Sequence, residues 1–258
     1  MRYLLLGFAM VAAGAVAETG ADKPTVLITG SNRGIGLEFV RQLSARDWRV
    51  IATARNPEAA TELQALAGTD PDILIEYLDV TDHPGIDALA KKYRDQAIDI
   101  LLLNAAMGPT SQTAGRRLAK LDFDVARQSF EVNSIGPMKV AQAFMPNVEA
   151  SQKKLVLAMS SDSGSFVAGS KVAALYHYKA SKAALNMYFH TLHFETGRKG
   201  VTAVMLHPGM VGTNPQLMRF PGALKTSDSV AQLLVVIDGL TPADNGRFVD
   251  YRGETMPW

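Results

Sequence analysis

Seven short apolar runs, separated by longer stretches of helical period, constrain the fold of this chain more than any other feature. The runs predict strands at Thr25–Thr29, Trp48–Ala54, Asp72–Leu78, Ile98–Asn104, Lys153–Ser160, Val201–His207 and Gly246–Tyr251. Between them, amphipathic stretches such as Gly36–Asp47 and His83–Ala97 carry apolar residues at intervals of three and four. Strands that are apolar on both faces and alternate with helices predict an α/β fold, in which a doubly wound parallel β-sheet is flanked by helices on both faces.

Composition limits both the number of domains and the partners. No Pro/Gly/Ser-rich linker and no internal repeat interrupts the alternation, so we expect residues 23–258 to form a single domain. The formal net charge is +1 and comes from interspersed acidic and basic residues, without a basic run of the kind that neutralises nucleic acid. Cysteine is absent, which excludes disulfides, thiolate metal sites and cysteine nucleophiles. We therefore expect a small-molecule partner, no nucleic acid and no metal.

The first 22 residues resemble a secretory signal and are set apart from the domain. Arg2 precedes an apolar stretch, Tyr3–Val16, which is too short to span a bilayer and ends in the small residues before Glu18. This pattern predicts cleavage after Ala17 and export, for example to the periplasm. The alternative is an uncleaved hydrophobic extension or a misplaced start codon on a cytoplasmic protein.

A glycine-rich turn follows the first predicted strand. The segment Thr29–Gly36 reads TGSNRGIG, with glycines at Gly30, Gly34 and Gly36. At the carboxyl edge of a parallel sheet, a helix amino terminus offers free N–H groups, and glycines let a pyrophosphate approach that backbone. The alternative is a tight connection between strand and helix with no ligand.

Tyr178 and Lys182 form the clearest candidate for chemistry. They are four residues apart on a predicted helix, so they lie on one face, one turn apart. The phenol pKa, ordinarily about 10, is too high for efficient proton exchange at neutral pH, and a neighbouring cation is expected to lower it. A serine hydroxyl holding a substrate oxygen, Tyr178 donating a proton and a nicotinamide delivering hydride would together reduce a carbonyl. The alternative is an ordinary surface pair on a helix.

Several separated segments together resemble the short-chain dehydrogenase/reductase family of single-domain Rossmann-fold oxidoreductases. The similarity runs from about Thr25 to the C-terminus. Its motifs are TGSNRGIG, LDVTD (78–82), LNAAMG (103–108), FEVNSIGP (130–137), MSSDSG (159–164), YKASK (178–182) and HPGMVGT (207–213). Within the family, the chain looks most like the C-factor and sniffer-type carbonyl reductase branch.

The resemblance implies a set of site residues. The implied catalytic residues are Ser161, Tyr178 and Lys182, with Asn133 steadying a water that links Lys182 to solvent. The implied cofactor-binding residues are Gly30, Ser31, Asn32, Arg33, Gly34, Ile35, Gly36, Arg55, Asp79, Val80, Asn104, Ala105, Ala106, Tyr178, Lys182, Pro208, Gly209, Val211 and Thr213. Two departures stand out: Leu103 and Ala106 replace the first Asn and last Gly of the family's N-N-A-G, and the segment before Tyr178 is longer than usual. The longer segment leaves open which of Ser160, Ser161 and Ser163 faces the site, and Ser161 is preferred by its match to the motif.

The charges around the second strand favour NADP(H) over NAD(H). An NAD enzyme of this fold places an acidic residue about twenty positions beyond the glycines to bind the ribose 2′-hydroxyl. The stretch Val50–Pro57 holds no acid and contains Arg55, while Arg33 lies inside the glycine-rich turn. Two cations suit a 2′-phosphate. The alternative is that both arginines are merely solvated.

Three functions fit these motifs, in this order of preference. The first is an NADP(H)-dependent carbonyl reductase or alcohol dehydrogenase acting on a small carbonyl or alcohol substrate. The second is a dinucleotide-binding signalling or sensor protein, and the third is an epimerase or dehydratase on the same scaffold. The apolar residues of the lid-like segment 214–226 suggest an apolar carbonyl compound. The family resemblance also implies a homodimer or homotetramer.

Overall fold

The computed structural model describes residues 23–110, 113–213 and 217–258 of the 258-residue chain. Within these ranges, seven strands form one sheet: β1 (Thr25–Ile28), β2 (Arg49–Ala54), β3 (Ile73–Tyr77), β4 (Ile100–Leu103), β5 (Leu155–Met159), β6 (Thr202–His207) and β7 (Phe248–Asp250). Each strand falls within one of the seven apolar runs. The signal-like segment 1–22 lies outside the described residues.

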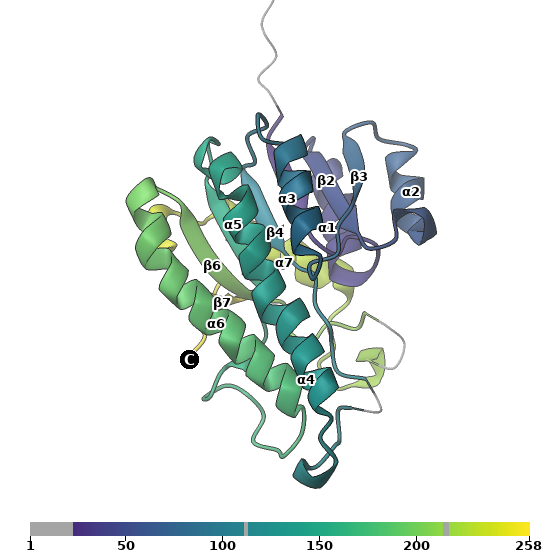
Figure 1. Ribbon diagram of the computed structural model, residues 1–258, viewed down its shortest axis with the longest axis vertical. Coiled ribbons are helices and arrows are strands. Elements are labelled where there is room, and N and C mark those ends of the chain that lie inside the picture. Colours follow the sequence, from purple (N-terminus) through teal and green to yellow (C-terminus); the bar gives the residue numbers. More distant parts are fainter. Residues whose placement is uncertain (1–22, 111–112, 214–216) are drawn as a thin grey trace, which may run out of the picture.

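All strand pairs are parallel, and the spatial order is β3-β2-β1-β4-β5-β6-β7 (Figure 1). In β1, Leu27 pairs with Ile51 of β2 on one side and Leu101 of β4 on the other. The order reverses between β1 and β4, which is the topological switch point where sheets of this kind bind ligands. The predicted doubly wound parallel sheet is confirmed.

Helices connect the strands. They are α1 (Gly34–Ser44), α2 (Thr61–Ala67), α3 (His83–Lys92), α4 (Phe123–Phe130), α5 (Gly136–Glu149), α6 (Tyr176–Thr196) and α7 (Thr226–Asp238). A π-helical turn, η3 (Glu131–Ile135), joins α4 to α5. Short 3₁₀ turns lie at η1 (Pro57–Ala59), η2 (Leu118–Lys120), η4 (Asp162–Gly164), η5 (Gly197–Lys199), η6 (Leu217–Arg219) and η7 (Pro242–Asp244). Across the described residues, no helix is long and apolar enough to cross a membrane.

The helices cover the sheet in two layers because successive side chains of each strand point to opposite faces. On one face, Val26 and Ile28 of β1 join the core formed with α1, α2 and α7. On the other, Leu27 joins the core formed with α3, α5 and α6, the helices in front of the sheet in Figure 1. Both faces of the sheet are therefore covered by apolar side chains. The candidate site residues lie beyond the carboxyl ends of the strands.

Candidate active site

The glycine-rich turn connects β1 to α1, and its backbone requires glycine. Gly30 and Gly34 have φ of 71° and 59°, in the left-handed region. A Cβ at Gly36 would lie 2.2 Å from the carbonyl oxygen of Gly30. The N-cap residue of α1, Arg33, makes no side-chain capping bond, whereas Asp82 caps α3 through Gly85 N at 3.1 Å. The first turn of α1 thus keeps its N–H groups free of a side-chain cap.

The turn is held by the strands beside it. The side-chain amide of Asn104, after β4, donates to the carbonyl oxygens of Thr29 at 3.0 Å and Gly30 at 3.1 Å. In return, the Thr29 hydroxyl accepts from the backbone N–H groups of Asn104 and Ala105, both at 3.0 Å. A Cβ at Gly30 would lie 2.9 Å from Cα of Ala105, so the two loops meet at the switch point with no room for a side chain.

The side chains of the turn differ in exposure. Ser31 is fully buried, and its hydroxyl donates to the carbonyl of Ile28 at 2.9 Å. Its side chain therefore anchors the turn within the protein. Asn32 and Arg33 are exposed, and Ile35 is half-buried.

Two cations lie at this edge of the sheet. Arg55 directly follows β2, the neighbour of β1, and is exposed like Arg33. Neither guanidinium forms a hydrogen bond or ion pair with any residue that the structure describes. Both are therefore available to an anionic ligand.

The remaining predicted cofactor residues lie on two further loops. After β3, one carboxylate oxygen of Asp79 accepts from the backbone and hydroxyl of Thr81, at 2.9 and 2.8 Å, and Val80 is buried. After β6, Ser229 donates to the carbonyl of Pro208 at 2.7 Å, which fixes the following turn. The same loop carries Gly209, with φ of 79°, Val211 and Thr213. Ala106, after β4, is exposed.

Thr213 connects the loop after β6 to the glycine-rich turn. Its Cγ2 would lie 3.3 Å from a Cβ at Gly34. The structure therefore brings together two motifs from opposite ends of the domain.

Tyr178 and Lys182 lie one turn apart near the start of α6, as predicted. Lys182 is 2% exposed, and its Nζ donates to the carbonyl oxygen of Met159 at 2.8 Å. Burial lowers the pKa of Lys182 to about 8. Burial also raises the pKa of Tyr178, the Ser161 hydroxyl lowers it, and the charge of Asp162 raises it.

The net direction for Tyr178 differs from the expectation that a neighbouring cation lowers the phenol pKa. The reason is that burial disfavours the charged phenolate and outweighs the other influences, while Lys182 directs its ammonium to Met159. Because its pKa is raised above the ordinary value of about 10, Tyr178 carries its phenol proton at neutral pH.

The structure distinguishes the three serines that the sequence left open. Ser160 is turned into the core, where its hydroxyl donates to the side-chain oxygen of Asn186. Ser163 directs its hydroxyl toward Asp162 at 3.4 Å. Ser161, the N-cap of η4, donates its hydroxyl to Oδ1 of Asp162 at 2.9 Å and is the serine that lowers the pKa of Tyr178.

Asn133 lies in the π-helical turn and is fully buried. Its side-chain oxygen accepts from the backbone N–H of Met107 at 2.7 Å, and its amide donates to the Met107 carbonyl and the Ser181 hydroxyl, both at 3.0 Å. The side chain thus ties the segment after β4 to α6, between Tyr178 and Lys182.

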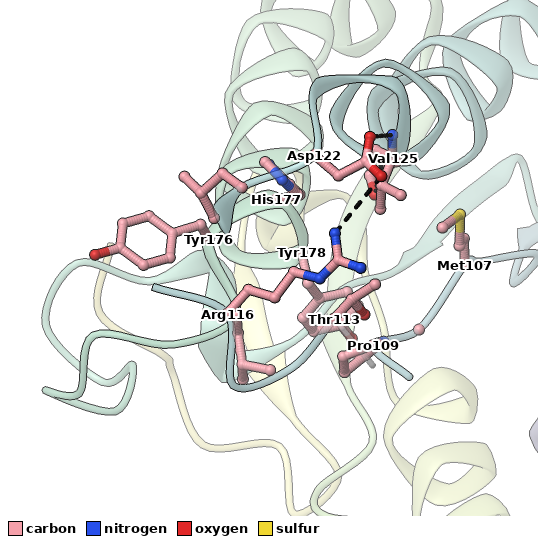
Figure 2. Close-up of a pocket in the computed structure, with 13 residues that line it drawn as sticks. Met107, Pro109, Thr113, Arg116, Asp122, Val125, Tyr176, His177 and Tyr178 are labelled. Carbon is pink, nitrogen blue, oxygen red and sulfur yellow. Dashed lines mark hydrogen bonds and ion pairs between the residues drawn. The ribbon is translucent and has the colours of Figure 1, made fainter. Parts of the chain in front are cut away.

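A pocket opens beside Tyr178 (Figure 2). It is lined by Met107, Gly108, Pro109, Thr113, Arg116, Leu121, Asp122, Val125, Ser129, Leu175, Tyr176, His177 and Tyr178. Figure 2 shows the guanidinium of Arg116 turned toward Asp122, with which it forms an ion pair at 3.5 Å. Sequence reasoning missed this wall, because Arg116, Asp122 and His177 belong to no spaced motif. The sequence instead predicted a lid-like apolar segment at 214–226, and part of that segment lies outside the described residues.

A family model and two curated proteins match most or much of this chain. The family model described as short chain dehydrogenase matches residues 24–220. An uncharacterized oxidoreductase of Schizosaccharomyces pombe is 32% identical over 254 residues, covering 90% of this chain and 96% of the relative. C-signal of Myxococcus xanthus is 36% identical over 162 residues, covering 62% of this chain and 93% of the relative.

Solved structures superpose over most of the domain. Carbonyl reductase Sniffer of Drosophila melanogaster has a TM-score of 0.83 and 29% identity, covering 92% of this chain and all of that chain. NADPH-bound carbonyl reductase from chicken fatty liver also has a TM-score of 0.83, with 30% identity, covering 92% of this chain and 94% of that chain.

Proposed function

This chain belongs to the short chain dehydrogenase family, and on that premise we propose that it is an NADP(H)-dependent oxidoreductase that interconverts a small carbonyl compound and its alcohol. One observation carries the proposal. Half-buried Tyr178 and buried Lys182 lie one turn apart on α6, at the same sheet edge as Ser161 and the glycine-rich turn. The NADPH-bound carbonyl reductase among the similar structures supports the same activity.

The residues present fit a dinucleotide phosphate. The turn around Gly30 and Gly36 has no space for side chains, and α1 begins without a side-chain cap, so a pyrophosphate can approach that backbone. Arg33 and Arg55 make no ion pair within the described part of the chain and suit a 2′-phosphate. When bound, the dinucleotide supplies the hydride for the carbonyl carbon.

The protein's own residues handle the substrate oxygen and its proton. Tyr178, held protonated by burial, donates its proton to the oxygen as the carbonyl is reduced. The Ser161 hydroxyl hydrogen-bonds to the substrate oxygen beside Tyr178 and orients that oxygen. Lys182 is the buried ammonium one turn away, and Asn133 braces α6 against the segment after β4. Because both polar atoms of the Asn133 side chain are engaged, a water linked to Lys182 would bind the backbone carbonyl of Asn133.

The direct test is turnover by the purified protein. We expect a panel of aldehydes, ketones and quinones to include compounds that the protein reduces with consumption of NADPH, followed by absorbance. Tyr178→Phe should lose this activity, whereas Tyr188→Phe, a half-exposed tyrosine on the same helix, should retain it. Equal activity of Tyr178→Phe and the wild type would contradict the proposal.

A second candidate function rests on the similarity to C-signal. In that case the domain binds a dinucleotide as a sensor or signalling protein with little turnover. Binding of NADPH without reduction of any carbonyl compound would favour this candidate. The intact Ser161–Tyr178–Lys182 set favours the enzyme.

The proposal includes assembly into a homodimer or homotetramer. Met187 and Phe194 on α6 are 64% and 60% exposed, an apolar surface that association would cover. Light scattering on the purified protein tests this part, and a monomer at micromolar concentration would contradict it.

A further inference from the structure

A histidine side chain binds the loop that carries the candidate catalytic serine. This Ser161 loop, residues 160–164, follows β5 and includes the 3₁₀ turn η4. At the end of β6, Nδ1 of His207 accepts a hydrogen bond of 3.2 Å from the backbone N–H of Asp162. Asp162 follows Ser161 directly, so the bond fixes the peptide group that leaves the serine.

The bond continues the pairing of β5 with β6 into the loop. The last backbone bond between the two segments runs from the N–H of Ser160 to the carbonyl oxygen of Leu206, at 2.8 Å. Two residues further along, the N–H of Asp162 has its acceptor in the imidazole of His207. The next carbonyl of β6, that of Pro208, accepts from the Ser229 hydroxyl at 2.7 Å. A side chain thus holds the point at which the backbone ladder has ended.

The other side of the Ser161 loop lies against α6, the helix that carries Tyr178 and Lys182. The side-chain amide of Asn186 donates to the carbonyl oxygen of Gly164 at 3.3 Å. A Cβ at Gly164 would lie 2.9 Å from the carbonyl oxygen of Lys182, so the loop and the helix are in close contact. The loop is therefore held between α6 and His207, and release of the His207 bond would let Ser161 move relative to the helix.

We propose that His207 is a positioning residue, which as a neutral imidazole holds Ser161 in place for the substrate oxygen and which releases the loop when it takes up a proton. The inference rests on the proposed function and deepens it. An imidazole nitrogen accepts a hydrogen bond only while it carries no hydrogen, so protonation of Nδ1 removes the acceptor for Asp162. The hydroxyl hydrogen of Ser161 rotates to suit its acceptor, whereas its oxygen is placed by the backbone that His207 holds.

The groups around His207 keep it neutral at pH 7. Burial lowers its pKa, while the carboxylates of Asp162 on η4 and Asp250 on β7 raise it, and the effect of burial prevails. The charge of Asp250 is itself paired, because its Oδ2 accepts from Nε of Arg252 at 2.9 Å. The pKa of His207 therefore lies below the ordinary value of about 6.5, and protonation belongs to acidic pH.

The remaining elements at this end of the sheet bring little charge to the imidazole. On α6, Lys182 directs its ammonium to the carbonyl of Met159, and Met159 of β5, paired with Leu206, is uncharged. Where α7 meets the loop after β6, the contact is the uncharged Ser229.

Two substitutions separate the acceptor from its titration. In His207→Asn, Oδ1 is as many bonds from Cα as Nδ1 is in histidine, so it can accept from Asp162 at any pH. His207→Leu offers no acceptor. At pH 7.5, His207→Leu should lower kcat for carbonyl reduction roughly threefold to tenfold, the range for loss of one hydrogen bond, and His207→Asn should retain most of the activity. Equal losses in the two variants would overturn the inference.

The pH profile gives a second readout. Below about pH 6.5, kcat of the wild type should decline, and His207→Asn should not share that decline. His190→Asn is the matched control, because His190 is a half-buried histidine of α6 whose Nδ1 has no hydrogen-bond partner among the described residues. Its profile should follow that of the wild type. His177 also lines the pocket, so an acid decline that persists in His207→Asn would point to another group and overturn the inference.

Nuclear magnetic resonance separates the inference from the proposed function. In the ¹⁵N-labelled protein without substrate, the amide proton shift of Asp162 should titrate between about pH 7.5 and 5 in the wild type and stay constant in His207→Asn. A merely structural role would lower the Tm of both variants, with the same amide titration in the wild type and His207→Asn, and would overturn the inference. If no carbonyl compound is reduced, the proposed function fails, and the Asp162 amide still decides whether His207 holds the loop.

Discussion

The ammonium of Lys182 donates a hydrogen bond of 2.8 Å to the carbonyl oxygen of Met159, the last residue of β5. This bond joins α6 to the strand end that carries Ser160 and Ser161, so the helix with the phenol and the loop with the serine are held in one unit. The Lys182 side chain is only 2% exposed, so folding buries a charged group. The stability of the protein should therefore depend on the protonation of Lys182.

We expect the free energy of unfolding to rise with pH through the titration of Lys182. Its pKa is lowered from 10.5 to about 8 on folding, so between these values the unfolded chain binds more protons than the folded one. The penalty for burying the charge is present below about pH 8 and is relieved as the pH rises toward 10.5. The full change is at most about 3 kcal/mol.

Denaturant melts of the wild type and Lys182→Met at pH 7.5 and pH 10 measure this effect. The stability of the wild type relative to Lys182→Met should increase between the two conditions. Lys91→Met, on the exposed side of α3, should show no such change. A difference independent of pH would mean that Lys182 keeps its ordinary pKa.

Tyr178→Phe and Lys182→Met should each reduce the rate of carbonyl reduction by roughly 10²–10⁴-fold, the range for loss of general acid catalysis. Tyr178→Phe removes one oxygen from a packed ring, so NADPH affinity and Tm should change little. The double variant should be scarcely slower than either single one, because the two residues act as one unit. Losses that multiply in single-turnover measurements would show instead that the residues act independently.

Arg55→Ala should weaken NADPH binding roughly tenfold to a hundredfold and leave NADH binding nearly unchanged. A charge-assisted hydrogen bond to the 2′-phosphate is worth about 1.5–3 kcal/mol, and NADH has no group to take its place. Fluorescence titration with both dinucleotides measures the effect. Arg94→Ala, a 72% exposed arginine paired with Asp95, is the control. Equal weakening of NADPH and NADH binding would contradict the preference for NADP(H).

Gly36→Ala should damage both stability and dinucleotide binding. A Cβ at this position would lie 2.2 Å from the Gly30 carbonyl oxygen, so the turn has to move. Overpacking of this kind costs about 1–3 kcal/mol, or roughly 2–12 °C in Tm for a domain of this size. Gly115→Ala, where a Cβ would meet nothing within 4 Å, should be neutral by thermal melting and NADPH titration. A stable Gly36→Ala protein that binds NADPH normally would contradict the close approach.

Periodicity was sufficient to predict the strands, because a strand that is apolar on both faces and a helix with one apolar face are recorded in local residue spacing. The one-turn separation of Tyr178 and Lys182 follows from the same local geometry. The positive φ angles of Gly30 and Gly34 follow from residue type, since glycine alone adopts them without strain. These features need no knowledge of distant contacts.

The environment of each side chain was decided by tertiary structure. Three serines within four residues look alike in sequence, yet Ser160 donates to Asn186 in the core while Ser161 caps η4. Ser31 lies in a cofactor motif, yet its hydroxyl donates a hydrogen bond to the carbonyl oxygen of Ile28. The sequence alone determined the candidate catalytic residues and the spacing of Tyr178 and Lys182 along a helix. Burial decided that the pKa of Tyr178 is raised and that of Lys182 is lowered, because a pKa depends on the environment that folding builds around a group.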